Sequence, residues 1–189
     1  FIRSLPNLSR FNKDGGFLCS SWELYRAQQR ITRRLAELGY RAAYFHGRGG
    51  SASRGGAPTE RAIAAQPAGT IAGRLRLTEQ GEVVSSKYAN RGTALHHLEL
   101  LTASVLTHTA LSETGRRPNP EEEEAMEALS GMSQAAYDGL IRSPGFVAYF
   151  QEASPVDELS ALKIGSRPAR RHGASTLADL RAIPWVFAW

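Results

Sequence analysis

The chain has 189 residues, which is enough for one domain with a hydrophobic core but too few for two large domains. Its 42% hydrophobic and 22% charged residues are ordinary for a globular protein, and its net charge of +5 favours anionic partners. The single cysteine, Cys19, excludes an internal disulfide framework and fits a reducing cytoplasm. There is no signal peptide and no apolar run long enough to cross a membrane, so we predict neither secretion nor a membrane partner.

A helix is predicted between residues 18 and 38. Its aromatic and aliphatic residues recur at helical spacing and predict a buried stripe, made of Leu18, Trp22, Tyr25, Ile31, Leu35 and Leu38. Ser20 or Ser21 is the expected cap of this helix, and Gly39 is its expected end. Cys19 is expected to be a packed, unreactive thiol.

An apolar run at residues 42–45 predicts a short buried strand, and a loop rich in glycine and arginine follows it up to Pro58. Glycines let the backbone approach a ligand closely, and successive amide groups in such turns form a concavity that binds anions. Arg48 and Arg54 add planar guanidinium groups suited to phosphate or carboxylate. Thr59 is expected to cap a helix over residues 60–66. Strand, cationic loop and helix together predict an anion site.

Two other interpretations of this loop stay open. Arginine–glycine pairs also occur in disordered segments that bind single-stranded nucleic acid, where arginine stacks on the bases. A glycine-rich loop can also be a simple connector. The aliphatic elements close on both sides of the loop favour a structured anion site, and no long block of basic residues supports nucleic acid as the partner.

The next elements are a predicted strand over residues 74–80, from its alternating polarity, and a predicted helix over residues 82–88. Glu79 and Glu82 have two interpretations, as a catalytic carboxylate pair or as ion-pair partners of nearby arginines. We favour the structural role, because such residues more often pair with local arginines, and Arg48, Arg54 and Arg76 are candidate partners.

An amphipathic helix is predicted over residues 92–111, with an apolar side made of Leu95, Leu98, Leu101, Val105 and Leu106. Its histidines, His96, His97 and His108, do not predict a metal site. Neighbouring residues point about 100° apart on a helix, and no two of these histidines have the four-residue spacing of a shared ligand pair.

Two more helices are predicted before the last part of the chain. Asn119 and Pro120 indicate the start of a helix that ends near Arg142, and the acidic run at residues 121–124 suits its positive end. Pro144 and Gly145 then separate it from a short aromatic helix over residues 146–150.

The last part of the chain places two arginines beside apolar runs. Residues 161–164 lead into Gly165-Ser166-Arg167-Pro168, and Arg181 begins an apolar, strand-like segment that continues to Phe187. An unpaired charge in such surroundings is costly, and an anionic substrate would pair with it.

Several of these stretches resemble, in order, the motifs of phosphoenolpyruvate carboxylase of the bacterial type. The matching stretches are Asn12-Lys13-Asp14-Gly15-Gly16, Phe45-His46-Gly47-Arg48-Gly49-Gly50-Ser51, Arg54-Gly55-Gly56-Ala57-Pro58, Leu75-Arg76-Leu77-Thr78-Glu79-Gln80-Gly81-Glu82, Ile164-Gly165-Ser166-Arg167-Pro168 and Leu180-Arg181-Ala182-Ile183-Pro184-Trp185. The resemblance runs from about residue 12 to residue 189. Motifs of this length in the same order form a specific signal.

The resemblance implies an α/β fold, namely part of a TIM-type barrel with extensive helical insertions. We expect residues 1–189 to form a single partial catalytic domain from the C-terminal half of the enzyme, truncated at both ends. It also implies roles for individual residues. The implied catalytic residues are Lys13, His46 and Arg54, and the implied substrate-binding residues are Arg48, Gly49, Gly50, Gly55, Gly56, Arg167 and Arg181.

The resemblance also implies a divalent cation, Mg²⁺ or Mn²⁺, in the complete enzyme. Its metal-binding aspartate corresponds to Arg10, and arginine cannot ligate a cation. We therefore expect no metal ligand in this chain. Either this copy lost the ligand, or residues 1–11 are read in a shifted frame.

The implied reaction is the carboxylation of phosphoenolpyruvate by bicarbonate to oxaloacetate and phosphate, in the cytoplasm. The complete enzyme is expected to be a homo-oligomer. The alternatives are an inactive fragment of that enzyme and a module that binds single-stranded nucleic acid through the arginine–glycine loop.

Overall fold

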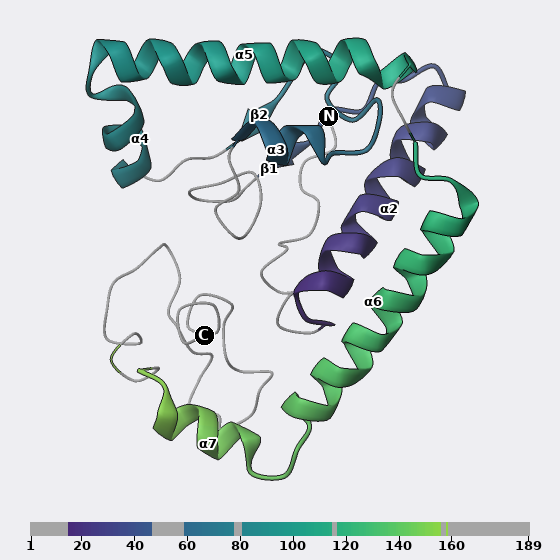
Figure 1. The fold of residues 1–189 in the computed structure, drawn as a ribbon, viewed down its shortest axis with the longest axis vertical. Helices are drawn as coiled ribbons and strands as arrows, with labels where there is room; N and C mark the ends of the chain where they lie inside the picture. The colour runs from purple at the N-terminus through teal and green to yellow at the C-terminus, as the bar shows by residue number, and fades with distance from the viewer. Residues whose placement is uncertain (1–14, 47–58, 78–80, 115–116, 156–157, 159–189) are drawn as a thin grey trace. The chain divides into compact units, whose positions relative to one another are not determined.

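The computed structural model describes residues 15–46, 59–77, 81–114, 117–155 and 158. Its helices and strands, in chain order, are α2 (Phe17–Glu37), β1 (Phe45–His46), α3 (Thr59–Ala64), β2 (Arg76–Leu77), α4 (Gly81–Tyr88), α5 (Arg91–Thr114), α6 (Pro120–Ile141) and α7 (Phe146–Ala153) (Figure 1). The chain divides into two compact units, one made of Phe1–Leu5 and Glu23–Asn119, the other of Pro6–Trp22 and Pro120–Trp189. The first turns of α2 belong to the second unit, and the rest of α2 belongs to the first.

The end of α2 confirms the predicted role of Gly39. This residue has a φ of 78°, in the left-handed region, where a side chain would be strained. Its N–H donates to the Ala36 carbonyl at 3.0 Å, and the Tyr40 N–H donates to the Leu35 carbonyl at 2.8 Å. These two bonds form the Schellman motif, which satisfies carbonyls at the end of a helix.

The start of α2 differs from the prediction. Ser20 and Ser21 lie inside the helix and cap nothing, because α2 begins at Phe17. The Ser20 hydroxyl donates instead to the carbonyl of Gly16, in the turn that precedes the helix. The predicted buried stripe is also shorter than expected, since Trp22 is buried but Leu38 is 58% exposed.

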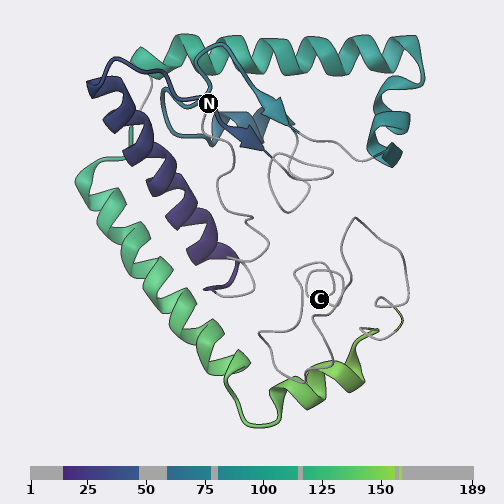
Figure 2. The ribbon, with the colours of Figure 1, turned by 180° about the vertical axis from the view of Figure 1, so that it is seen from behind.

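In the first unit, β1 and β2 pair in parallel (Figure 2). Phe45 lies opposite Arg76, and His46 lies opposite Leu77. Both strands have two residues, so each is shorter than the predicted run. Ala42 and Tyr44 are buried as expected, although they precede the strand. With α3 between them, the two strands form a β–α–β crossover, the usual connection of parallel strands.

The core of the first unit lies under α3 and the turn that follows it. Ile63 of α3 and Ile71 of the turn are almost completely enclosed, and Pro67 and Thr70 are buried with them. α3 differs from its prediction at both ends, because Thr59 is its first residue and it stops at Ala64. Pro67 explains the early end, since proline disfavours helical geometry in the residue before it.

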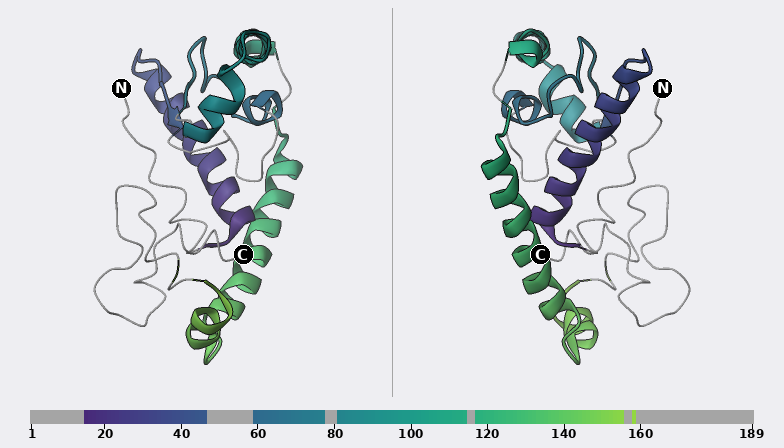
Figure 3. Two further views of the ribbon diagram at one scale, coloured as in Figure 1. Left: turned by 90° about the vertical axis from the view of Figure 1, so that its left-hand side faces the viewer. Right: turned by 90° about the vertical axis from the view of Figure 1, so that its right-hand side faces the viewer.

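The inward face of α5 carries polar side chains beside the half-buried Leu101 and Val105, and the prediction of its apolar side is wrong for three leucines. Leu95, Leu98 and Leu106 are 55%, 50% and 62% exposed. α3 and α4 both pack on the other side of this helix (Figures 1 and 3). No helix in the described ranges is long and apolar enough to cross a membrane.

The turn over residues 66–73 explains why α5 faces inward with polar groups. The Gly69 N–H donates to Ser112 Oγ at 3.1 Å, and the Gly73 N–H donates to Thr109 Oγ1 at 2.8 Å. His108 Nε2 lies 3.0 Å from the Gln66 carbonyl, so this nitrogen carries the proton. Backbone groups of a packed turn need such partners, and leucines cannot supply them.

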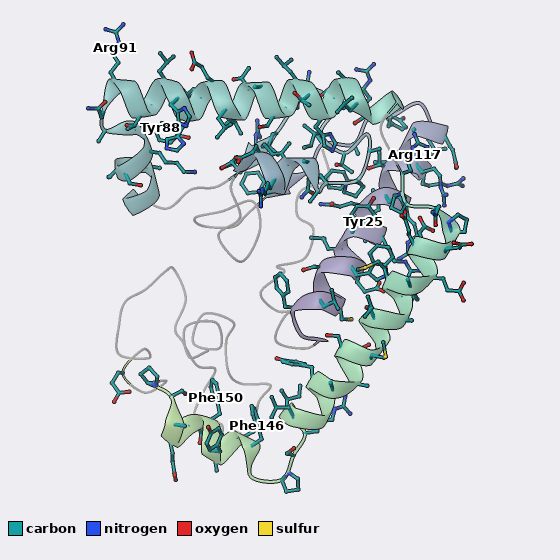
Figure 4. All side chains as sticks on the ribbon, viewed as in Figure 1. Tyr25, Tyr88, Arg91, Arg117, Phe146 and Phe150 are labelled. Carbon is teal, nitrogen blue, oxygen red and sulfur yellow. The ribbon has the colours of Figure 1, made fainter. Side chains whose placement is uncertain are left out.

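In the second unit, α6 begins at Pro120 as predicted and ends at Ile141, one residue before the predicted end. α7 extends the predicted aromatic helix by three residues, to Ala153. Its rings of Phe146 and Phe150 stack with centroids 6.2 Å apart, on one side of the helix (Figure 4). Both phenylalanines are buried.

Replacing Ala72 by glycine is expected to stabilise the first unit. Ala72 has a φ of 39°, a conformation that strains any residue with a Cβ atom. Relief of this strain, less the backbone entropy that glycine loses on folding, should raise the free energy of unfolding by up to about 1 kcal/mol. Urea unfolding followed by far-ultraviolet circular dichroism measures the change.

The neighbouring Gly73 supplies the matched control for Ala72→Gly. Gly73 has a φ of 76° with nothing near the position of an added Cβ, so Gly73→Ala tests backbone strain alone. It should lower the urea midpoint while Ala72→Gly raises it. Equal shifts in one direction would contradict this account of the turn.

Candidate active site

Most residues that the sequence assigned to the site lie outside the described residues. These are Lys13, Arg48, Gly49, Gly50, Arg54, Gly55, Gly56, Arg167 and Arg181, together with Arg10 at the expected metal position. His46 is described as the last residue of β1, but its side chain is not. The structure therefore describes the elements that flank the glycine-rich loop in the chain, which are β1 and α3.

The carboxyl ends of β1 and β2 define one edge of the sheet. Because the strands are parallel and paired, His46 and Leu77 end side by side at this edge. The glycine-rich loop continues from His46, and Thr78-Glu79-Gln80 continues from Leu77. Two motifs far apart in the sequence thus begin next to each other. Ligands of parallel α/β proteins bind at this end of the strands.

Tyr44 fixes the position of β1 against α2. Its hydroxyl donates to the Gln28 carbonyl at 3.0 Å and, since it has one proton, accepts the Thr32 hydroxyl at 2.9 Å. Burial raises the pKa of the Tyr44 phenol above its usual value, and the hydrogen bond with Thr32 partly offsets this. No motif in the sequence predicts this contact, although a tyrosine in a short buried run signals that its hydroxyl has a partner.

A shallow hollow lies where β2, α4 and α5 meet. It is lined by Thr59, Leu77, Lys87, Tyr88, His97, Leu100 and Leu101. The rings of Tyr88 and His97 meet edge to face, with centroids 6.4 Å apart, at the corner between α4 and α5 (Figure 4). Lys87 thus adds a basic group near the carboxyl end of β2, and no sequence motif pointed to it.

Glu60 brings a carboxylate to the point where the glycine-rich loop ends. It lies in the first turn of α3, and its Oε2 atom is buried without a hydrogen-bond partner in the described part of the chain. A buried carboxylate oxygen is costly unless a donor satisfies it. A guanidinium group is a suitable partner, and the loop just before Glu60 carries Arg48 and Arg54. The predicted role of Glu79 and Glu82 stays untested, because their side chains are not described.

The turn that follows Lys13 is tightly enclosed in the second unit. Gly16 has a φ of 74°, and a Cβ atom added to it would lie 3.1 Å from Cγ of Tyr137 in α6. A Cβ atom at Gly15 would meet only ordinary contacts, 3.7 Å from Cys19 Sγ. Gly16 is therefore required both by its backbone conformation and by the ring above it.

The described residues offer no site for a divalent cation. The resemblance implies a metal-binding carboxylate at the position of Arg10, and an arginine offers donors only. In the described residues, no three His, Cys, Asp or Glu side chains form a group that could hold a metal ion. The histidines of α5 have other contacts, such as the bond of His108 to Gln66.

Tyr44→Phe is expected to change how stability depends on alkaline pH. An unfolded tyrosine titrates near pH 10, and burial holds the pKa of Tyr44 higher in the folded chain. Its contribution is therefore fully present below about pH 10 and is lost as the pH rises through the folded pKa. At neutral pH the free energy of unfolding of the variant should be about 1 kcal/mol lower than that of the parent, because the hydrogen bonds of the hydroxyl are gone. As the pH rises above 10, the free energy of unfolding should fall less in the variant than in the parent.

Urea midpoints across the alkaline range measure this difference. Tyr40→Phe is the control, because Tyr40 is 66% exposed in the same unit. Parallel pH profiles for the parent and Tyr44→Phe would contradict the assigned role of burial.

Comparison with known proteins accounts for the motifs at this site. The chain matches the family model described as phosphoenolpyruvate carboxylase over residues 8–189. The phosphoenolpyruvate carboxylase of Methylorubrum extorquens is 64% identical over 94% of this chain and 19% of that protein. Those of Chromobacterium violaceum and Mycobacterium leprae are 49% and 46% identical over the same share of this chain, which covers 20% and 19% of them. The chain spans about a fifth of the length of the curated relatives it matches, and it belongs to the phosphoenolpyruvate carboxylase family.

Proposed function

We propose that this chain is part of the catalytic half of a phosphoenolpyruvate carboxylase, a lyase that carboxylates phosphoenolpyruvate with bicarbonate to give oxaloacetate and phosphate. The observation that carries the proposal is the 64% identity to such an enzyme over 94% of the chain. The position of the glycine-rich loop supports it, because the loop starts at the carboxyl end of a parallel strand.

The chemistry explains why the site needs many arginines. In the proposed reaction, bicarbonate attacks phosphorus, which gives carboxyphosphate and the enolate of pyruvate. Carbon dioxide released from carboxyphosphate then reacts with the enolate. Every other species is an anion, so fixed positive charges stabilise each step.

The proposed roles follow from the family motifs. Arg48, Arg167 and Arg181 hold the phosphate and carboxylate of the substrate, with the amides of Gly49, Gly50, Gly55 and Gly56 beside them. Arg54 stabilises carboxyphosphate and shields the enolate from water. His46 positions substrate and carbon dioxide, and Lys13 adds charge near bicarbonate.

We also propose that the chain forms part of a TIM-type barrel in a cytoplasmic homo-oligomer. The parallel crossover of β1, α3 and β2 supports this fold, because such barrels repeat that unit. In the complete enzyme Mg²⁺ or Mn²⁺ is expected, held by residues outside this chain, so no step assigned here depends on it.

Arg54→Ala and Arg167→Ala should affect different kinetic constants. The host is the full-length Methylorubrum extorquens carboxylase in which residues 12–189 of this chain replace the matching stretch, so that the host keeps its own residue at the position of Arg10. Arg54 contacts charge that develops during reaction, so its loss should lower kcat by roughly 10²–10³. Arg167 holds the bound substrate, so its loss should chiefly raise the KM for phosphoenolpyruvate. Steady-state kinetics that show only a raised KM for Arg54→Ala, or an unchanged KM for Arg167→Ala, would contradict these roles.

The 189-residue chain alone is expected to have no carboxylase activity. It contains about a fifth of its relatives' length and has Arg10 where a metal-binding carboxylate is expected. The test couples oxaloacetate formation to malate dehydrogenase, with phosphoenolpyruvate, bicarbonate and Mg²⁺ present. Oxaloacetate above the blank, abolished by Arg181→Ala, would show that the chain holds a working site.

A further inference from the structure

Helix α5 has apolar residues on both of its sides. Its inner side packs against α3 and α4 and includes the half-buried Leu101 and Val105. Between Gly92 and Ser112 the helix has a single Asp, Glu, Lys or Arg residue, which is Glu99. A helix at the surface of a globular protein normally carries charged residues on the side that faces water, whereas a helix that is apolar all round is normally buried. The composition of α5 therefore suits a helix that is covered on both sides.

The outer side of α5 carries Leu95, Leu98 and Leu106, which together are called the leucine face. Intervals of three and eight residues place these side chains on one side of the helix. They are 55%, 50% and 62% exposed. α3, α4 and both strands lie on the other side of α5, and no described element of the first unit covers the leucine face (Figures 1 and 2). Apolar area of this kind is unfavourable in water, so the leucine face suits a partner.

The area of the leucine face argues against a second copy of the chain as its partner. α5 has 24 residues, so one side of it is about 36 Å long and about 10 Å wide, which offers on the order of 400 Å². A standard interface between separate proteins buries about 800 Å² on each partner. Separate chains also lose translational and rotational freedom on association, whereas segments of one chain are already joined. A face of this size is therefore better matched to a segment of the same polypeptide.

The length of the relatives shows that such a segment is available. The chain spans 19% of the Methylorubrum extorquens carboxylase, so about four fifths of that polypeptide lies outside the matched stretch. We propose that the leucine face is an internal interface of the complete carboxylase, covered by a segment of the same polypeptide outside this chain. The inference rests on the proposed function, because it takes the chain as part of the longer enzyme.

The sequence of α5 sets the chemistry of the covering segment. Aliphatic side chains are needed opposite the leucine face, because the burial of apolar area stabilises such a contact. Glu99 follows Leu95 by four residues, about one helical turn, and so lies on the same side of the helix. A carboxylate that another segment covers needs a positively charged partner. The covering segment should therefore present one lysine or arginine among aliphatic residues.

The first experiment places a charge on the leucine face. In the full-length host described above, Leu106→Glu should lower the midpoint of thermal unfolding by about 3 °C or more, because it buries an unpaired carboxylate. In the 189-residue chain, where position 106 faces water, it should leave the midpoint within about 1 °C. Thr107→Glu is the matched control, since Thr107 is exposed and points about 100° away from Leu106. An unchanged midpoint of Leu106→Glu in the host would overturn the proposal.

The second experiment tests the cover without adding a charge. Leu98→Cys is labelled with a maleimide in the 189-residue chain and in the host, and mass spectrometry of the peptide that contains residue 98 distinguishes this thiol from other cysteines. The thiol should react at least about tenfold more slowly in the host, because the covering segment must open first. Equal rates would overturn the proposal. Protection that is lost when the host is diluted and its subunits separate would assign the leucine face to another subunit, and would overturn it too.

Oxaloacetate formation separates this inference from the proposed function. If the parent host forms oxaloacetate and the thiol at position 98 is equally reactive in the host and in the 189-residue chain, the interface fails while the function stands. If the parent host is folded but forms no oxaloacetate, the proposed activity of this chain fails. The difference in labelling then still decides whether the leucine face is covered.

Discussion

The parallel pairing of β1 with β2 is the constraint on which the proposed site depends. It brings His46, the last residue of β1, beside Leu77, the last residue of β2, so the segments that follow the two strands start at one edge of the sheet. Strands of two residues contribute few hydrogen bonds of their own. The pairing must therefore be held from outside, by Tyr44 on the α2 side and by hydroxyl groups of α5 on the side of the turn.

These supports share a chemical character. Backbone groups of the turn over residues 66–73 form hydrogen bonds with Thr109, Ser112 and His108. Tyr44, just before β1, forms hydrogen bonds with a threonine hydroxyl and a backbone carbonyl. Hydrogen bonds have narrow geometry, whereas apolar contacts tolerate sliding. The proposed site, with several guanidinium groups around one substrate, would gain from supports that fix distance as well as proximity.

Local chemistry explains which elements could be predicted from the sequence. Gly39 ends a helix because of its own backbone freedom, and Pro120 starts one because its missing N–H costs nothing there, so both positions are readable without tertiary information. The inward face of α5 was not readable. Leucines dominate its periodic pattern, but the turn over residues 66–73 needs acceptors for its amide groups, and only the folded chain reveals that need. Ser20 is likewise a residue type that commonly caps helices, yet α2 begins before it, and its hydroxyl donates to the Gly16 carbonyl.

For the site, the motifs named the charged residues, whereas Tyr44, Glu60, Lys87 and Tyr137 lie outside those motifs and became visible only through their contacts.

The left-handed backbone of Gly16 has a consequence for how this segment can evolve. Every single-base missense change of a glycine codon introduces a residue with a Cβ atom, and each such residue meets both the unfavourable φ and the ring of Tyr137. Gly15, one position earlier, has room for a Cβ atom and no such conformation. Adjacent glycines in one motif therefore differ in the structural cost of a substitution. Alanine or serine can replace the first without a close contact, whereas any substitution of the second strains the backbone even where the aromatic residue on α6 gives way.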